Sequence, residues 1–252
     1  MSLRDAAVAV TGAGSGMGRA TARLFAERGA DVAAVDVDGG AAEGTADLIA
    51  DDGGTAIAVE ADVSDAAAVE GFVEETVEAF GGLDVLHNNA GVAQQSTPVE
   101  DVTEATWDRV QDVNLKGAFL GAKYAVPHLR ESEHEGGGVI LNTASTAGIR
   151  PRTGLSAYAA SKGGMITLTK QLAFELADDG VRVNAICPVA TDTDRLPEFA
   201  GGDLTLDGIA DTIPLGRLCQ PEDVAEAAVF LADDGASMIT GTALEVDGGR
   251  DI

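Results

Sequence analysis

Two side chains that could perform acid/base chemistry, Tyr158 and Lys162, are four residues apart in the run YAASK. On a helix this spacing places both on one face. A free tyrosine has a pKa near ~10 and is a poor base at neutral pH, but a neighbouring ammonium stabilises the phenolate. Lowering the pKa by roughly two to three units would make the phenol an efficient acid/base. Ser145, thirteen residues before Tyr158, could donate a hydrogen bond to a carbonyl oxygen.

A Tyr-x-x-x-Lys pair is by itself most often an ordinary surface pair, so its meaning depends on the elements around it. Short apolar runs alternate with helical patterns along the chain, and their continuity is typical of parallel strands buried on both faces. The alternation predicts a three-layer, doubly wound α/β fold. No linker or repeat divides residues 1–252, so we expect one domain. The predicted strands are Ala6–Val10, Asp31–Val35, Ala56–Val59, Val85–His87, Val139–Asn142, Val181–Ile186 and Ala243–Val246. The predicted helices include Arg19–Arg28, Ala66–Phe80, Glu104–Leu129, Ala157–Ala177 and Asp223–Ala232.

Two connections are long and rich in glycine, Ser132–Gly138 and Thr191–Leu215. The second follows the carboxyl end of a predicted strand, the edge at which open α/β sheets bind ligands. We therefore predict that residues 191–215 form a substrate loop.

The first predicted strand runs into a glycine-rich turn, TGAGSGMG, which spans residues 11–18 and precedes a helix. Gly12, Gly16 and Gly18 would permit a tight turn and close approach of a pyrophosphate to main-chain N–H groups at the helix N-terminus. The spacing is G-x-x-x-G-x-G and does not fit the common G-x-G-x-x-G pattern. Its position between strand and helix nevertheless favours nucleotide binding.

Asp36 stands at the end of the second predicted strand, 18 residues after Gly18. A carboxylate there can accept the ribose hydroxyls of NAD and would repel the 2′-phosphate of NADP. No Arg or Lys occurs at positions 35–42, and Arg19 is the one nearby cation that could meet a phosphate. The sequence therefore predicts NAD. Asp62, after the third strand, could lie near adenine or could equally cap a helix.

Several motifs follow one another at compatible spacings: the glycine turn, NNAG at 88–91, Asn114, Ser145 and the Tyr158–Lys162 pair. Together they resemble the short-chain dehydrogenase/reductase family, and the resemblance extends to VDGG at 246–249, essentially the whole chain. It implies a Rossmann fold with a mostly parallel seven-stranded sheet, assembled as a homotetramer or homodimer. It also implies an enzyme that transfers a hydride between nicotinamide and a small alcohol, ketone, sugar or hydroxyacyl substrate.

The resemblance implies four catalytic residues. Tyr158 would be the acid/base, and Lys162 would lower its pKa and bind the nicotinamide ribose. Ser145 would polarise the substrate carbonyl, and Asn114 would hold a water in a proton relay.

The resemblance also implies the contacts of the cofactor NAD. Two residues near the expected carboxamide site depart from the family pattern: Pro188-Val189 stands where the family usually has Pro-Gly, and Thr191 stands where an aliphatic residue is common. The expected cofactor-binding residues are Gly12, Ser15, Gly16, Met17 and Gly18 in the turn, Asp36, Asp62 and Val63 at the adenosine, Asn89, Gly91, Tyr158 and Lys162 along the riboses, and Val189, Thr191 and Thr193 near the nicotinamide.

Charge is the unusual feature of the composition. The chain has 42 acidic and 16 basic residues, a formal net charge of −26, with 45% hydrophobic residues. Nucleic acid and anionic membranes are poor partners for such a surface. The composition resembles that of cytoplasmic proteins from extreme halophiles, with an ordinary acidic mesophile as the alternative.

The remaining features indicate a cytoplasmic protein without a metal. No apolar run approaches a membrane span, and the N-terminus lacks the pattern of a signal peptide. Two cysteines imply no disulfide framework, and the three histidines lack metal-ligand spacing.

Other functions stay open. One is an NADPH-dependent 3-oxoacyl-[acyl-carrier-protein] reductase, which Asp36 and an acidic surface disfavour because the carrier is itself acidic. Another is a non-catalytic nucleotide-binding regulator, which would not need Ser145, Tyr158 and Lys162. A third is a lyase or epimerase with bound NAD. Arg150 could meet an anionic substrate, as could Arg152, although surface ion pairs are the commoner use of such residues.

Overall fold

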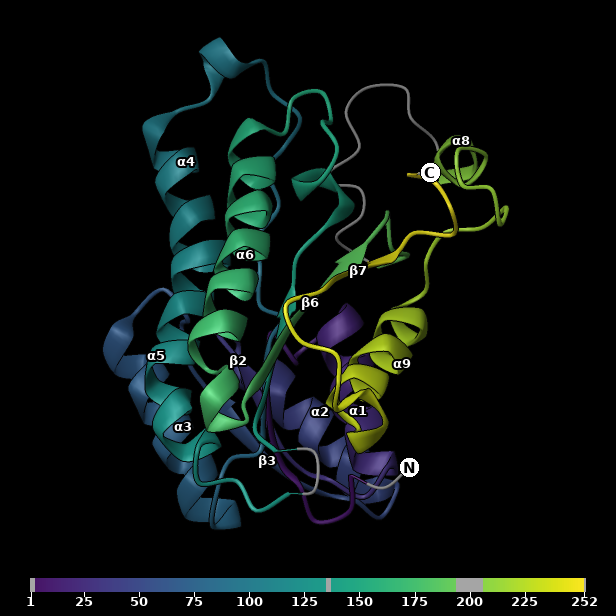
Figure 1. Cartoon of the computed structure of the whole chain (residues 1–252). Coiled ribbons are helices and arrows are strands. Elements are labelled where there is room, and N and C mark those ends of the chain that lie inside the picture. The colour runs from purple at the N-terminus through teal and green to yellow at the C-terminus, as the bar shows by residue number, and fades with distance from the viewer. Residues whose placement is uncertain (1–2, 135–136, 194–205, 252) are drawn as a thin grey trace.

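Seven parallel strands form one sheet in the computed structural model, which describes residues 3–134, 137–193 and 206–251. The order across the sheet is β3-β2-β1-β4-β5-β6-β7 (Figure 1). This confirms the predicted doubly wound fold, and each predicted strand is present with its ends shifted by one or two residues at most. The strands are β1 (Ala7–Thr11), β2 (Asp31–Asp36), β3 (Thr55–Glu60), β4 (Val85–Asn88), β5 (Val139–Thr143), β6 (Arg182–Pro188) and β7 (Ala243–Val246).

Helices cover both faces of the sheet, and this explains why the strands are continuously apolar (Figure 1). In β1, Val8 and Val10 pack into the core on one face, while Ala9 between them packs into the core on the other. One layer holds α1 (Gly16–Glu27), α2 (Gly39–Asp51) and α9 (Pro221–Ala232), and the other holds α3 (Ala66–Phe80), α4 (Glu104–Gln111), α5 (Gly117–Leu129) and α6 (Ser156–Glu175). Among the described residues, no helix is both long and apolar enough to cross a membrane.

The helix α2 adds to the predicted elements. Its sequence contains Gly39, Gly40 and Gly44, which lower intrinsic helix propensity. Tertiary packing against β2 and β3 and an N-cap overcome this cost, since the Asp38 carboxylate accepts the Ala41 N–H at 3.1 Å.

The predicted helix Glu104–Leu129 is helical throughout, but its middle differs from a regular α-helix. A five-residue π-helical segment, Asp112–Lys116, joins α4 to α5. The wider turn lets the buried Asn114 side chain bond to groups outside its own helix, as described below. Insertions of this kind often mark functional sites.

The topological switch point lies between β1 and β4, because the chain proceeds from β1 to β2 and β3 on one side and to β4 and β5 on the other. The carboxyl ends of these strands form the crevice in which such sheets bind ligands. The predicted substrate loop 191–215 is described only at its two ends. Thr191 pairs with Cys219, and the short helix α8 (Leu206–Ala210) lies within the loop; residues 194–205 are outside the described part.

Candidate active site

A cavity of about 1250 Å³ opens at the carboxyl ends of the strands. Of the predicted site residues, only Asn114 is absent from its walls, and that side chain lies just behind them. The lining residues that the sequence predicted are Gly12, Ser15, Gly16, Met17, Gly18, Asp36, Asp62, Val63, Asn89, Gly91, Ser145, Tyr158, Lys162, Val189, Thr191 and Thr193.

The glycine turn leaves no room for side chains. A Cβ atom on Gly18 would collide with the carbonyl oxygen of Gly12. Gly16 has a φ of 50°, and a Cβ there would lie 3.2 Å from Cγ2 of Thr193. The main-chain N–H groups at the start of α1 are therefore open to the cavity, and Thr193 lies opposite the turn.

The carboxylate of Asp36 is held at the end of β2. Its Oδ2 accepts the N–H of Gly14 at 2.8 Å, and its Oδ1 accepts the N–H of Asp38 at 3.1 Å. Gly14 was not among the predicted site residues, although a Cβ there would lie 2.8 Å from Oδ2 of Asp36. Each oxygen keeps acceptor capacity for a further donor.

The Arg19 side chain lies beneath the glycine turn and forms hydrogen bonds within the protein. Its Nε donates to Oγ1 of Thr45 at 3.0 Å, and its Nη2 donates to the carbonyl oxygen of Gly14. Arg19 does not line the cavity. The cation that could have met a 2′-phosphate is thus bonded to the protein.

Asp62 lines the cavity and does not cap a helix. Its Oδ1 accepts the N–H of Ser64 at 2.9 Å and the Ser64 hydroxyl at 2.7 Å. The N-cap of α3 is Asp65. Val63 packs against Gly117 at the start of α5, where a Cβ would come within 3.0 Å of it.

Asn89 ties three strand ends together at the switch point. Its main-chain N–H donates to Oγ1 of Thr11 at 3.0 Å, and its Nδ2 donates to the Thr11 carbonyl at 2.9 Å. Its Oδ1 accepts the hydroxyl of Thr143 at 3.2 Å. Asn89 fixes the geometry of the crevice through these bonds and also borders the cavity.

Lys162 is buried and reaches from α6 to the end of β5. Its Nζ donates to the carbonyl oxygen of Thr143 at 2.6 Å and lies 5.8 Å from the centre of the Tyr158 ring. A Cβ on Gly91 would lie 3.5 Å from this nitrogen. The structure therefore brings Gly91, Tyr158 and Lys162 together, as their order in the sequence predicted.

Ser145 faces the same end of the cavity. Its Oγ accepts the N–H of Ala147 at 3.1 Å, which leaves the hydroxyl hydrogen for donation. The 3₁₀ turn that follows, Thr146–Gly148, packs against α6. Ser145 and Tyr158 are thus held by elements that touch each other.

Asn114 links α6 to the segment after β4. Its Oδ1 accepts the N–H of Val92 at 2.7 Å, and its Nδ2 donates to the Val92 carbonyl and to Oγ of Ser161, both at 3.1 Å. Asn114 therefore bonds to Ser161, the residue that precedes Lys162 on α6, and in this position it supports the wall of the cavity.

Comparison with known proteins agrees with this geometry. The family model described as Enoyl-(Acyl carrier protein) reductase matches residues 12–251. The chain is a short-chain dehydrogenase/reductase. It is therefore an oxidoreductase that acts on alcohol or carbonyl groups.

Three similar proteins illustrate the range of the family. The chain is 44% identical to 4-formylbenzenesulfonate dehydrogenase TsaC1/TsaC2 of Comamonas testosteroni, with 100% of both chains covered. It is 41% identical to cis-4-hydroxycyclohexanecarboxylate dehydrogenase of Sinomonas cyclohexanicum, covering 95% of this chain and 94% of that one. A crystal structure of 3-ketoacyl-(acyl-carrier-protein) reductase from Brucella melitensis complexed with NADH superposes with a TM-score of 0.93 at 44% identity, with both chains fully covered.

The two departures of this dehydrogenase from the family pattern lie side by side. Val189 is buried and packs with Ile209 and Ile213, so its extra side chain helps anchor the region around α8. The Thr191 hydroxyl donates to the Val189 carbonyl at 3.0 Å and is directed at the protein's own main chain.

Two glutamines of this dehydrogenase also hold the start of α6, the helix that carries Tyr158 and Lys162, and no local motif marks them. The Gln94 Oε1 accepts the N–H groups of Ala157 and Tyr158 at 2.9 and 3.0 Å, satisfying donors at the start of α6. Gln111 donates to the Ala157 carbonyl at 2.9 Å. Their partners are 46 to 64 residues away in sequence, so only the fold reveals them.

Proposed function

We propose that this protein is an NAD-dependent dehydrogenase that interconverts the hydroxyl and carbonyl groups of a small substrate carrying a six-membered ring. One observation carries the proposal. A single cavity joins the Asp36 carboxylate at one end to Ser145, Tyr158 and Lys162 at the other. A dinucleotide bound at the switch point would span these two ends.

The residues present fit NAD. The glycine turn is a cradle that any Cβ would fill, and its N–H groups suit a pyrophosphate. Asp36 would accept ribose hydroxyls, and the described residues beside it offer no cation for a 2′-phosphate, since Arg19 is bonded to Gly14 and Thr45. A bound nicotinamide would supply the hydride acceptor or donor.

The chain's own residues would handle the proton. The Tyr158 phenol would take the substrate hydroxyl proton during oxidation and return it during reduction. The buried ammonium of Lys162 would favour the phenolate through its positive charge. The Ser145 hydroxyl would donate to the substrate oxygen and stabilise the charge that develops there. Asn114 would brace the wall that carries Lys162 and, as predicted from the family, hold a relay water.

We include a six-membered ring in the proposed substrate because of the two dehydrogenases compared above, from Comamonas testosteroni and Sinomonas cyclohexanicum. Both names describe a six-membered ring that bears an aldehyde or a hydroxyl group. The walls near Tyr158 include Val92, Ala93, Leu155 and Ile209, whose apolar side chains suit such a ring.

A 3-ketoacyl-(acyl-carrier-protein) reductase is the second candidate, favoured by the similar structure from Brucella melitensis. The net charge of −26 disfavours it, because an acidic carrier protein would be repelled.

A substrate panel with this full-length protein tests the proposal. Cyclic alcohols and ring aldehydes would be compared with acetoacetyl-CoA, each with NAD(H) and with NADP(H), in molar KCl. The proposal expects NAD(H)-linked turnover of ring substrates. Turnover confined to acetoacetyl-CoA with NADPH would establish the second candidate.

We also propose that the protein assembles into a homotetramer or homodimer. Large apolar side chains stay exposed on three neighbouring helices: Trp107 on α4 (43% exposed), Phe119 on α5 (50%) and Phe174 on α6 (85%). An exposed face of this kind is typical of a subunit interface. Light scattering after gel filtration in molar KCl tests this, and a monomer would contradict it.

A further inference from the structure

The charge of the cavity wall differs from that of the molecule around it. The chain has 42 acidic and 16 basic residues, yet among the residues that the structure describes three arginines line the cavity: Arg109, Arg152 and Arg250. Of the three acidic lining residues in this described part, two, Asp36 and Asp62, lie at the ends of β2 and β3, on the adenosine side of the switch point. The described wall on the side that holds Tyr158 therefore carries an excess of cations in a strongly anionic protein.

Arg152 is fixed at this end of the cavity. It lies in the segment between Ser145 and Tyr158, and its Nη2 contacts both carboxylate oxygens of Asp251 at 2.8 and 2.9 Å. The side chains of Arg152 and Asp251 are only 25% and 5% exposed. The sequence predicted an ion pair for this segment, and the pair also holds Arg152 in the wall of the cavity that contains Ser145 and Tyr158.

Arg250 precedes Asp251 and is the second arginine that lines this part of the cavity. Within the described part of the chain, this guanidinium has no hydrogen bond and no ion pair. Burial lowers its pKa, and the positive charge of Arg152 lowers it further, which shows that the two cations are neighbours. The Asp251 carboxylate is paired with Arg152, which leaves the neighbouring Arg250 guanidinium available to another anion.

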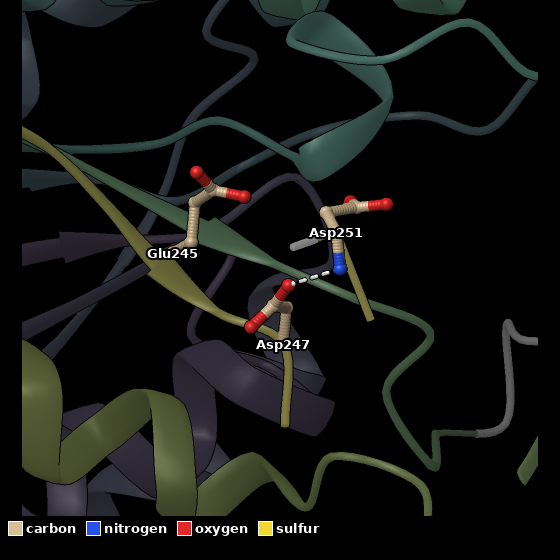
Figure 2. Close-up of side chains that lie close together, drawn as sticks. All are labelled: Glu245, Asp247 and Asp251. Carbon is tan, nitrogen blue, oxygen red and sulfur yellow. Dashed lines mark hydrogen bonds between the residues drawn. The ribbon is translucent and has the colours of Figure 1, made fainter. Parts of the chain in front are cut away.

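The nearby acidic cluster is engaged in building this arrangement. Glu245, Asp247 and Asp251 converge within 4.8 Å (Figure 2), a grouping that could in principle hold a metal ion. Glu245 instead accepts Arg150 at 2.9 Å, and Asp247 accepts the N–H groups of Gly249 and Asp251, each at 2.9 Å. Glu245 and Asp247 border a separate, smaller cavity. The carboxylates therefore shape the turn and hold Arg150 and Arg152, and of these two arginines Arg152 lines the main cavity.

We propose that Arg250, assisted by Arg152, binds an acidic substituent of the substrate, a carboxylate or a sulfonate, while Tyr158 exchanges the proton at the carbonyl end. The planar guanidinium matches such groups with paired hydrogen bonds. The pyrophosphate of a cofactor is a poorer occupant, because the glycine turn follows β1, and three strands separate β1 from β7. This inference rests on the proposed function, since it names the substrate class of the same site.

A binding experiment tests the anion site without turnover. Benzenesulfonate and the neutral benzenesulfonamide would be titrated calorimetrically into the protein with NADH, in one fixed KCl concentration. We expect the sulfonate to bind at least tenfold more tightly than the sulfonamide, and R250Q to remove the difference. R130Q is the matched control, because Arg130 pairs with Asp179 at 2.8 Å away from the cavity wall, and it should keep the difference. Equal affinity of the two compounds for the wild type would overturn the proposal.

Turnover supplies the second arm. With NADH, R250Q should lower kcat/KM for 4-formylbenzoate at least tenfold, mainly through KM, and change that for 4-methylbenzaldehyde less than twofold. R152K should lose less than R152Q, because R152Q leaves the buried Asp251 carboxylate unpaired. Equal losses on both aldehydes, or a loss confined to acetoacetyl-CoA, would overturn the proposal. If the wild type reduced neither aldehyde, the proposed function would fail, and the calorimetry would still decide the anion site.

Discussion

The side-chain oxygen of Gln94 accepts the main-chain N–H of Tyr158 at 3.0 Å, so a residue after β4 holds the start of the catalytic helix. The same oxygen accepts the N–H of Ala157, and its amide nitrogen donates to the Gly154 carbonyl at 3.0 Å. Gln94 is buried and uses both ends of its amide. It therefore acts as a positioning residue for Tyr158.

Gln94→Leu should reduce kcat at least tenfold, because the first donors of α6 lose their acceptor and Tyr158 can shift relative to Ser145. Gln94→Glu keeps the acceptor and should recover part of kcat. Gln95→Leu, at an exposed neighbouring position, is the control. Steady-state kinetics would show the effect. A fall in kcat that is the same for Leu and Glu would indicate general disruption of the segment and contradict the positioning role.

The sequence predicted the sheet because its signals are local. Each strand is a short, uninterrupted apolar run, and the α/β alternation leaves few topologies. The residues that line the cavity were equally accessible to prediction, since Tyr158 and Lys162 share one helix face and the glycine turn is contiguous. These features need no knowledge of distant contacts.

Features that depend on distant partners could not be predicted. The π-helical segment at 112–116 lies within a helical pattern, and only the contacts of Asn114 with Val92 and Ser161 account for it. Helix α2 contains three glycines, which lower its intrinsic helix propensity, so its sequence did not indicate a helix. The role of Arg152 also needed the structure, because its partner Asp251 is 99 residues away.

Tyr158→Phe should abolish turnover, with a loss of at least a thousandfold, because only the ionisable oxygen is removed. Calorimetry should show that NAD still binds. Tyr124→Phe is a matched control, since Tyr124 lies on α5 and does not line the cavity. Lys162→Ala should lose turnover and also cofactor affinity. Activity of Tyr158→Phe within tenfold of the wild type would remove Tyr158 from the mechanism.

Asp36→Ala should narrow the preference for NAD over NADP. A carboxylate that accepts ribose hydroxyls makes charge-assisted bonds of about 1.5 to 3 kcal/mol, and a discrimination of about 2.7 kcal/mol is a hundredfold preference. The change should appear as a lower kcat/KM for NAD. Asp38→Ala removes the cap of α2 and a neighbouring charge, and it should leave the ratio of the two cofactors nearly unchanged. A wild-type enzyme that uses NADP as well as NAD would show that Asp36 does not select the cofactor.

Molar salt should stabilise the protein. With a net charge of −26, the folded state repels itself at low ionic strength, and KCl screens that repulsion. Thermal melts should show a Tm that rises by several degrees or more from dilute to molar KCl. Sucrose at equal osmolality is the control for solvent exclusion and should raise Tm less. A Tm that is flat or falls in KCl would contradict the prediction of a halophilic source.

A buried histidine should make the protein sensitive to acid. His87 in β4 is fully buried, and burial lowers its pKa from 6.5 to about 3. Its Nε2 lies 2.8 Å from Oγ1 of Thr143, whose own hydrogen is donated to Asn89, so Nε2 carries the proton and donates. The other ring nitrogen, Nδ1, has no hydrogen-bond partner. Protonating it would place a charge in the core beneath the switch point.

The sign of the pH effect follows from the lowered pKa. Above pH 6.5 the histidine is neutral in both the folded and unfolded states and costs nothing. Below pH 6.5 the unfolded chain binds a proton that the folded protein refuses until about pH 3, so stability is lost as the pH falls. Between pH 7.5 and pH 5 this one group should lower the free energy of unfolding by about 2 kcal/mol. Urea denaturation of the wild type and of His87→Asn, at one protein and KCl concentration, isolates that contribution from the many carboxylates. The variant should lose about 2 kcal/mol less across this range. If the free energy of unfolding changed with pH equally in the wild type and in His87→Asn, His87 would accept its proton in the folded state as readily as in the unfolded chain. That result would contradict the prediction that His87 stays neutral in the core at the end of β4.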